Sequence, residues 1–395
     1  YTLSDTLSLH DALPIYFGAA EPNSLHGWEP NGSWFIRGLG PNAAAILRFT
    51  RFPASPAGVF SFGATLGDYD QTVAFVQYQN DDGRAHHAIR ISNRRSDGTL
   101  RYDSASCTGN DCRVCRGRLH TATWMPNESE SHNLVKVGEL AEPLQGAQNV
   151  RLLGNYAYVA NGFGIRIVDV QDPSHPVTVG TWNAGGSVND LRLVQAASRV
   201  FALVPFTPSR IVDVTDPAHA FTVSEIPESA YGVGIETRGK RSYAWWGERS
   251  GACPLYDVTD PLRPQLLSRF QTAGSAVDAI TVKDGVAYLN AWDGGLYRVD
   301  YANPAAPVVT GQWQSTISRS HASALTVAGG RKVVLHGDEG LGARLAIVDA
   351  EPASPTYMQE IGSYQTRSET AISNVTAIGD RAYVAYYHDG VRVLD

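Results

Sequence analysis

A repeat of just over forty residues runs through the chain from about residue 147 onward and constrains its fold more than any other feature. One unit reads NVRLLGNYAYVANGFGIRIVDVQDPSHPVTVGTW (149–182), and a later one reads AITVKDGVAYLNAWDGGLYRVDYANPAAPVVTGQW (279–313). Each unit contains four short β-like runs that are separated by glycine-rich and Asp-Pro turn signals. The aspartate that ends the third run recurs at intervals of 44, 44, 43, 49 and 46 residues, at Asp169, Asp213, Asp257, Asp300, Asp349 and Asp395.

This period predicts an all-β chain with a β-propeller of about six four-stranded blades. The composition agrees, because glycine (38), proline (21) and tyrosine (18) are abundant while methionine occurs only twice. The net charge of −7 gives no reason to expect a nucleic-acid partner. No apolar run reaches the roughly 18 residues of a membrane-spanning helix, so we expect no transmembrane segment.

Three segments carry a recognisable motif: IRIVDVQDP (165–173), IVDVTDP (211–217) and IVDAEP (347–352). They resemble the LVIVD repeat of bacterial and archaeal cell-surface proteins, and the resemblance extends over residues 133–395. Two positions depart from the pattern, since Asn303 replaces the usual aspartate before proline and Ala220 replaces the second proline. The resemblance implies a propeller and a secreted or cell-surface location, including attachment in the periplasm or at the outer membrane. It implies no particular activity.

The two ends of the repeat region suggest how the ring closes. Residues 133–141 (NLVKVGELA) match the fourth run of a unit, whereas the last unit, 372–395, has only three runs. We expect these segments to pair and close a ring of six blades, which removes exposed sheet edges. If the natural chain continues past residue 395, a seventh blade follows.

The N-terminal part lacks the repeat. Residues 1–16 resemble a translated sequencing adapter of the kind found in assembled environmental DNA, so we expect them to be non-native. Residues 17–130 show strand-like runs with turn signals between them, which predicts a small β-sandwich or jelly-roll-like domain followed by a linker at 120–132. The runs are 33–36, 45–52, 58–64, 72–79 and 87–92.

Three of the four cysteines lie close together in this N-terminal part. Cys107, Cys112, Cys115 and the distant Cys253 are candidates for two disulfides, or for one disulfide with Cys253 free. The alternative is a zinc site made by the three clustered cysteines with His120, although the spacing is not that of a common zinc module.

The propeller mouth is the second candidate site. Inner strands and the loops between second and third strands share one face of a propeller, so their polar residues converge there. Carboxylate and amide oxygens around a narrow axis suit Ca²⁺, with Asp190 and Asp278 as ligands, or a polar molecule. The alternative is that these residues cap turns and solvate the channel. The mouth residues are Asn149, Asp190, Asp278, His321 and Asn374, and the loops add Asp293, His336, Asp338, Glu339, His388 and Asp389.

The sequence contains no recognised catalytic motif. We therefore predict a secreted or cell-surface protein that uses its propeller as a binding or scaffolding module for a glycan or a protein partner. One alternative is a hydrolase or lyase whose mouth uses axial aspartate and histidine, with calcium as a cofactor. Another is a structural component of a surface layer.

Overall fold

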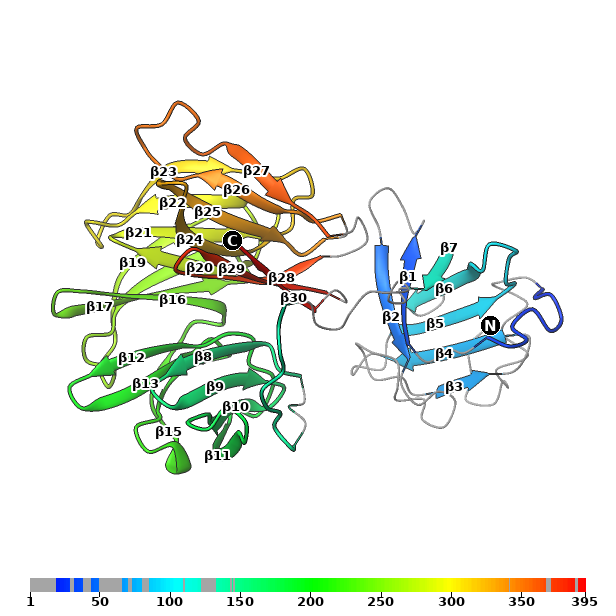
Figure 1. Cartoon of the computed structure of the whole chain (residues 1–395), viewed down its shortest axis with the longest axis horizontal. Helices are drawn as coiled ribbons and strands as arrows, with labels where there is room; N and C mark the ends of the chain where they lie inside the picture. The colour runs from blue at the N-terminus through cyan, green and yellow to red at the C-terminus, as the bar shows by residue number, and fades with distance from the viewer. Residues whose placement is uncertain are drawn as a thin grey trace. The chain divides into compact units, whose positions relative to one another are not determined.

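The computed structural model divides into two compact units, Tyr1–Glu130 and Ser131–Asp395, which are described here one at a time (Figure 1). The described residues contain no α-helix, and none of their segments is a helix long and apolar enough to cross a membrane. The predicted non-native residues 1–16 lie outside the described part. The structure describes residues 19–28, 32–37, 44–49, 66–69, 73–79, 85–108, 111–121, 133–142, 144, 146–340, 342–366, 371–387 and 390–395.

The described residues of the N-terminal unit form one antiparallel sheet of seven strands in the order β2-β1-β7-β6-β5-β4-β3. Four of the five predicted runs correspond to strands, and the remaining run, 58–64, lies outside the described residues. The described strands supply one of the two layers that a sandwich needs. The strands are β1 (Gly32–Arg37), β2 (Ala44–Phe49), β3 (Leu66–Tyr69), β4 (Val73–Gln79), β5 (Ala85–Ser92), β6 (Leu100–Thr108) and β7 (Asp111–Thr121).

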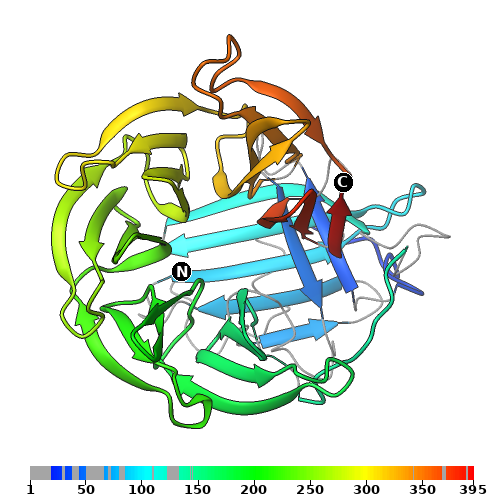
Figure 2. The same cartoon turned by 60° about the vertical axis from the view of Figure 1, so that its left-hand side comes forward.

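The described residues of the second unit form five four-stranded sheets and one three-stranded sheet, all antiparallel, which confirms the predicted propeller. Figure 2 shows these sheets following one another around a ring, from green through yellow to red. First strands of successive blades lie against one another, as β16 against β20 and β20 against β24.

Blades 1 to 3 are the following sheets. Blade 1 is β8 (Asn149–Leu153), β9 (Tyr156–Asn161), β10 (Gly164–Asp169) and β11 (Val177–Asn183); blade 2 is β12 (Arg192–Ala196), β13 (Arg199–Val204), β14 (Ser209–Asp213) and β15 (Phe221–Ile226), with the short 3₁₀ helix η2 (Pro217–His219) before β15; blade 3 is β16 (Ala230–Arg238), β17 (Arg241–Glu248), β18 (Ala252–Asp257) and β19 (Gln265–Gln271).

Blades 4 to 6 follow blade 3 around the ring. Blade 4 is β20 (Val277–Lys283), β21 (Val286–Ala291), β22 (Gly295–Asp300) and β23 (Val308–Trp313); blade 5 is β24 (Ser320–Ala328), β25 (Arg331–Asp338), β26 (Leu345–Asp349) and β27 (Glu360–Tyr364); blade 6 is β28 (Ile372–Ile378), β29 (Arg381–Tyr386) and β30 (Gly390–Leu394).

The recurring aspartate has the same local role in successive blades. Its side chain accepts a hydrogen bond from the backbone N–H two residues later, at 2.8 Å for Asp169, 2.8 Å for Asp213 and 2.9 Å for Asp257. This short loop ends the third strand and turns the chain toward the fourth. The spacing of these aspartates in the sequence therefore marks the blades.

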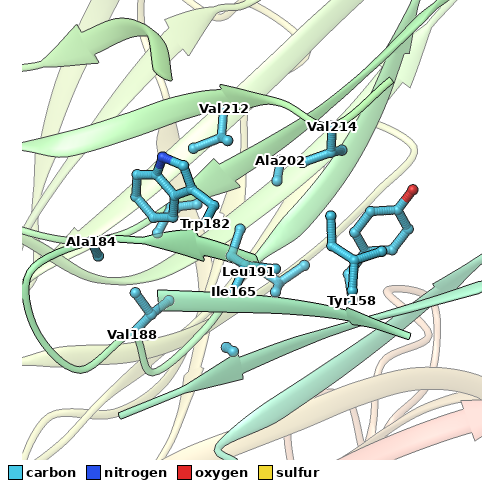
Figure 3. Close-up of a cluster of buried hydrophobic side chains, with 12 residues drawn as sticks. Tyr158, Ile165, Trp182, Ala184, Val188, Leu191, Ala202, Val212 and Val214 are labelled. Carbon is cyan, nitrogen blue, oxygen red and sulfur yellow. The ribbon is translucent and has the colours of Figure 1, made fainter. Parts of the chain in front are cut away.

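Apolar side chains fill the interfaces between blades. Between blades 1 and 2, Ile165 (2 % exposed), Leu191 and Val212 (both 0 %) pack with Tyr158 and Trp182 (Figure 3). Each such side chain contributes about 1.5–3 kcal/mol when it is fully buried. These residues come from both sheets, so the apolar face of each blade is buried by its neighbour.

The predicted closing strand is not formed. Residues 133–142 contain no strand, and the last sheet ends at β30. The segment nevertheless lies against the Asp-Pro turn of blade 1, because a Cβ added at Gly138 would meet the Pro173 oxygen at 2.0 Å. Gly180 on β11 has the same relation to Pro217 of blade 2, at 1.7 Å. The segment thus occupies the place of an outer strand next to blade 1 but makes no ladder with β30.

Candidate functional site

The first strand of each of blades 3 to 6 carries a β-bulge at its second residue. In β16, β20, β24 and β28 the pairing register shifts across the second residue of the strand. β8 and β12 of blades 1 and 2 pair with their second strands without such a shift. A bulged residue leaves the ladder, and its side chain is aimed differently from its neighbours. The four bulged residues are Tyr231, Asp278, His321 and Ser373.

The bulged residue His321 meets Glu339, a side chain from the loop between the second and third strands of its blade. The His321 Nδ1–H donates to the Ser373 carbonyl oxygen at 2.7 Å, and His321 Nε2 lies 3.7 Å from Glu339 Oε2. The Tyr387 hydroxyl donates to the same Glu339 carboxylate. His321 and Glu339 also act electrostatically on Asp278, and Asp278 and Glu339 act on Tyr231. We call Tyr231, Asp278, His321, Glu339 and Tyr387 the mouth cluster, which draws on blades 3, 4, 5 and 6.

Asp278 is the member of the cluster with unused hydrogen-bonding capacity. Its Oδ2 atom is buried and has no hydrogen-bond partner among the described residues. Burial raises the pKa of Asp278 to about 6; the negative charge of Glu339 acts in the same direction, while His321 and Arg249 oppose it. A desolvated carboxylate oxygen without a donor is unfavourable in the free protein and favourable for a ligand that brings a donor.

Two arginines stand at the rim of the cluster. The Arg249 guanidinium carbon lies 4.6 Å from the centre of the Tyr231 ring, and that of Arg319 lies 5.4 Å from the Trp292 ring. Trp292 in turn makes an edge contact with the His321 ring, with 6.3 Å between centroids. Both arginines are exposed. Stacking on an aromatic face fixes each guanidinium while its N–H groups stay available.

Asp190 has the opposite environment from Asp278. It accepts hydrogen bonds from Asn149 Nδ2 (2.8 Å) and from the guanidinium groups of Arg151 (3.4 Å) and Arg192. Backbone N–H groups of Leu191 and of Val233 in blade 3 add two more. Burial and the neighbouring Arg192 charge lower the pKa of Arg151 to about 10. Asp190 therefore links blades 1, 2 and 3, and a cation there would have to displace two arginines.

The remaining predicted mouth residues have separate partners. Asn374 Nδ2 donates to the Gln148 carbonyl oxygen at 3.4 Å and so links blade 6 with blade 1. Asp293 accepts from the Ser275 N–H and hydroxyl, both at 2.6 Å. Asp338 accepts from the Arg319 N–H at 3.2 Å. His388 and Asp389 lie outside the described residues.

His336 does not open to the mouth. Its ring is fully buried, and its Nε2 lies 2.9 Å from the Ser320 hydroxyl. Burial lowers its pKa to about 4, so the neutral ring is the stable form at neutral pH. His336 is a core histidine between blades.

The calcium site that the sequence predicts is not assembled in the described part of the chain. There, no group of three or more histidine, cysteine, aspartate or glutamate side chains is arranged to hold an ion. Asp190 and Asp278 also have different partner sets, as shown above. Calcium binding by these two residues stays a prediction that the contacts do not favour.

Two of the cysteines are free. Cys115 on β7 is exposed, and Cys253 on β18 is fully buried, which raises the pKa of its thiol. A framework of two disulfides is therefore not formed, because any such framework needs both of these residues. Cys107 and Cys112 are directly paired positions of the β6–β7 hairpin. Their side chains lie outside the described residues, so a bridge between them stays a prediction.

Sequence reasoning identified part of the mouth cluster and missed the rest. Asp278, His321 and Glu339 were predicted from their place at strand starts and loops. Tyr231 and Tyr387 were missed, as were the rim residues, since aromatic residues and arginines carry no positional signal in a single sequence. The bulges that bring them together depend on strand pairing.

The fold and its repeats define a repeat β-propeller protein. A family model described as the LVIVD repeat matches residues 146–184 and 273–314, so the chain contains LVIVD repeats in blades 1 and 4. Among curated proteins, none matches the chain.

Two solved structures are among those to which the chain is similar. The computationally designed Ika8 protein is 11 % identical with a TM-score of 0.47, and the alignment covers 84 % of this chain and 95 % of that one. Saccharomyces cerevisiae Sqt1 is 7 % identical with a TM-score of 0.49, and the alignment covers 78 % of this chain and 79 % of that one.

Proposed function

We propose that this protein is a binding protein whose propeller mouth, on the side of blades 3 to 6, takes a glycan. The observation that carries the proposal is the series of four bulges at Tyr231, Asp278, His321 and Ser373, together with the electrostatic effect of His321 and Glu339 on Asp278. Bulges are frequent next to binding sites, where they re-aim a side chain, and the first strands of blades 1 and 2 pair with their second strands without one.

The chemistry of the mouth cluster suits a sugar. Sugar hydroxyls are O–H donors, and the buried Asp278 Oδ2 atom needs a donor. Sugars also present flat C–H faces, which pack on aromatic rings such as Trp292 and the partly exposed Tyr387. Carboxylates, a histidine, arginines and aromatic rings on one face offer both kinds of contact.

We further propose that the protein works in a secreted or cell-surface setting. The LVIVD repeats support this proposal, because they resemble those of bacterial and archaeal cell-surface proteins. Labelling intact cells of the source organism with an antibody against the propeller tests it. A signal only after lysis would contradict it.

A glycan array with paired variants tests the binding proposal. We expect the full chain to bind a subset of glycans and the Asp278→Asn variant to lose about tenfold in affinity. Asp284→Asn is the matched control: Asp284 is exposed at the other end of the same strand, and its φ of 53° suits asparagine. Equal binding by all three proteins would contradict a site at the mouth. An empty array together with specific capture of a protein would favour a protein partner.

An enzymatic role is the second candidate, and one observation favours it. Asp278 has a pKa raised to about 6 and lies in the same cluster as Glu339 and His321, so a carboxylic acid near neutrality has a carboxylate close by. Such a pair can act as acid and base on a glycosidic bond. New reducing ends in any bound glycan, absent with Asp278→Asn, would establish hydrolase or lyase activity; none would leave binding alone.

A further inference from the structure

We infer that the ligand of the mouth is an acidic glycan, and that Arg249 and Arg319 bind the carboxylate groups of its uronic acid residues. This inference rests on the proposed function and adds the class of glycan.

Arg249 and Arg319 differ from the other arginines of the mouth. Arg151 and Arg192 are both bound to Asp190. The guanidinium groups of Arg249 and Arg319 make no ion pair with any residue in the described part of the propeller, and their contacts are the Tyr231 and Trp292 rings. An exposed arginine that stacks on an aromatic ring has lost side-chain conformational freedom but has not formed an ion pair in return.

Both arginines are connected to the mouth cluster through aromatic rings: Arg249 stacks on Tyr231, and Arg319 stacks on Trp292, which contacts His321. Arg249 lies in the loop between β17 and β18 and is close enough to Asp278 to influence its pKa. Arg319 directly precedes β24, where the next residue, Ser320, donates from its N–H to the Trp292 carbonyl oxygen at 2.9 Å. Exposed cationic groups thus lie beside the mouth cluster, whose carboxylates are hydrogen-bond acceptors.

This charge pattern selects among anionic ligands. A uronic acid carries hydroxyls, which donate to Asp278 and Glu339, and one carboxylate, which a guanidinium binds through two parallel hydrogen bonds. A densely charged polyanion is disfavoured, because the cluster contains the carboxyl groups of Asp278 and Glu339 and the whole chain carries a net charge of −7. A simple carboxylic acid would leave the Asp278 oxygen without a donor.

The test compares acidic oligosaccharides with their own carboxyl-reduced forms. Oligosaccharides of galacturonate, glucuronate and mannuronate are titrated into the full chain by calorimetry, and each is repeated after reduction of its carboxylates to primary alcohols. We expect at least one acidic form to bind about tenfold more tightly than its reduced form, and we expect added salt to shrink this difference. The free uronic acid monosaccharide is a further arm, expected to bind more weakly than the oligosaccharide.

Arginine variants complete the test. Arg249→Gln and Arg319→Gln should each lower affinity for the acidic form about fivefold to tenfold and leave the reduced form unchanged. Arg241→Gln is the control, because Arg241 is exposed at the opposite end of β17 and faces Asp257 at 3.7 Å. Thermal melts of all variants report whether each one folds.

The outcomes separate the two levels of the proposal. Equal affinity for acidic and reduced forms would overturn the inference and keep the glycan-binding function. An array positive only for neutral glycans would do the same. No binding of any glycan, with the Asp278→Asn variant indistinguishable from the parent, would overturn both.

Discussion

Asp190 and Asp278 look alike in the sequence and have opposite surroundings in the fold. Asp190 is 5 % exposed and is held by two arginines, one asparagine and two backbone N–H groups. Asp278 has a buried oxygen without a donor and a pKa raised to about 6. Position at the mouth is therefore not enough to make a binding carboxylate; the neighbouring strands decide whether its hydrogen-bonding capacity is used inside the protein.

The largest expected effect comes from removing the satisfied carboxylate. Asp190→Ala leaves Arg151 and Arg192 beside each other without an anion, and we expect a loss of about 3 kcal/mol in the free energy of unfolding. For a unit of this size the melting temperature should fall by about 10 °C. Differential scanning calorimetry of the full chain measures this, with Asp284→Asn as the unchanged control. A fall no larger than that of the control would show that Asp190 does not hold the blades together.

Removing the carboxylate of Asp278, by contrast, should raise the free energy of unfolding. The pKa of Asp278 is about 6 in the folded protein against an ordinary value of 3.8, so the folded state binds the proton more tightly. Stability therefore falls as pH rises from about 4 to about 6 and stays lower above that range. Arg249, His321 and Glu339 are the charged or titratable groups that influence the pKa of Asp278, and Asp278 in turn raises the pKa of Tyr231.

We expect Asp278→Asn to be about 2 kcal/mol more stable than the parent near pH 7.5 and equal to it near pH 4. Urea unfolding at the two pH values measures the difference. Asp293→Asn is a control of opposite sign: hydrogen bonds from Ser275 lower the pKa of Asp293, so its contribution is present at neutral pH and lost in acid. A variant less stable than the parent at neutral pH would contradict the picture of an unpaired Asp278.

A smaller effect should follow from changing the neighbour of Asp278. The Glu339 charge raises the pKa of Asp278, so Glu339→Gln should lower that pKa by a fraction of a pH unit. Carbon NMR of the Asp278 carboxyl group across a pH titration measures the midpoint. A midpoint that does not move would place Glu339 too far from Asp278 to belong to one cluster.

The smallest expected effect is that of calcium. Asp190 is occupied by arginines, and in the described residues no group of three metal-ligating side chains assembles around Asp278. We expect equal melting temperatures in EDTA and in millimolar Ca²⁺, since a ligand that binds only the folded state must raise the transition. A clear rise would restore the calcium prediction and identify Asp278 as the first residue to substitute.

Much of the fold could be read from the sequence because the repeat is local. Asp169, Asp213 and Asp257 each bond a backbone N–H only two residues away, so their spacing counts blades without knowledge of tertiary contacts. Ring closure could not be read in this way. The segment 133–142 reaches blade 1, yet its pairing with β30 depends on a register between opposite ends of the propeller, and that pairing is absent.

The sequence by itself determined that this protein is a propeller of LVIVD repeats and that polar residues gather at its mouth, because turns and strand alternation are set by neighbours in the chain. The tertiary structure decided which of these residues are available. The bulges of β16, β20 and β24 lie at Tyr231, Asp278 and His321, whereas Arg151 of blade 1 pairs with Asp190 at the start of blade 2. A bulge is a property of two paired strands, and an ion pair between blades is a property of two packed sheets, so neither is written in one segment alone.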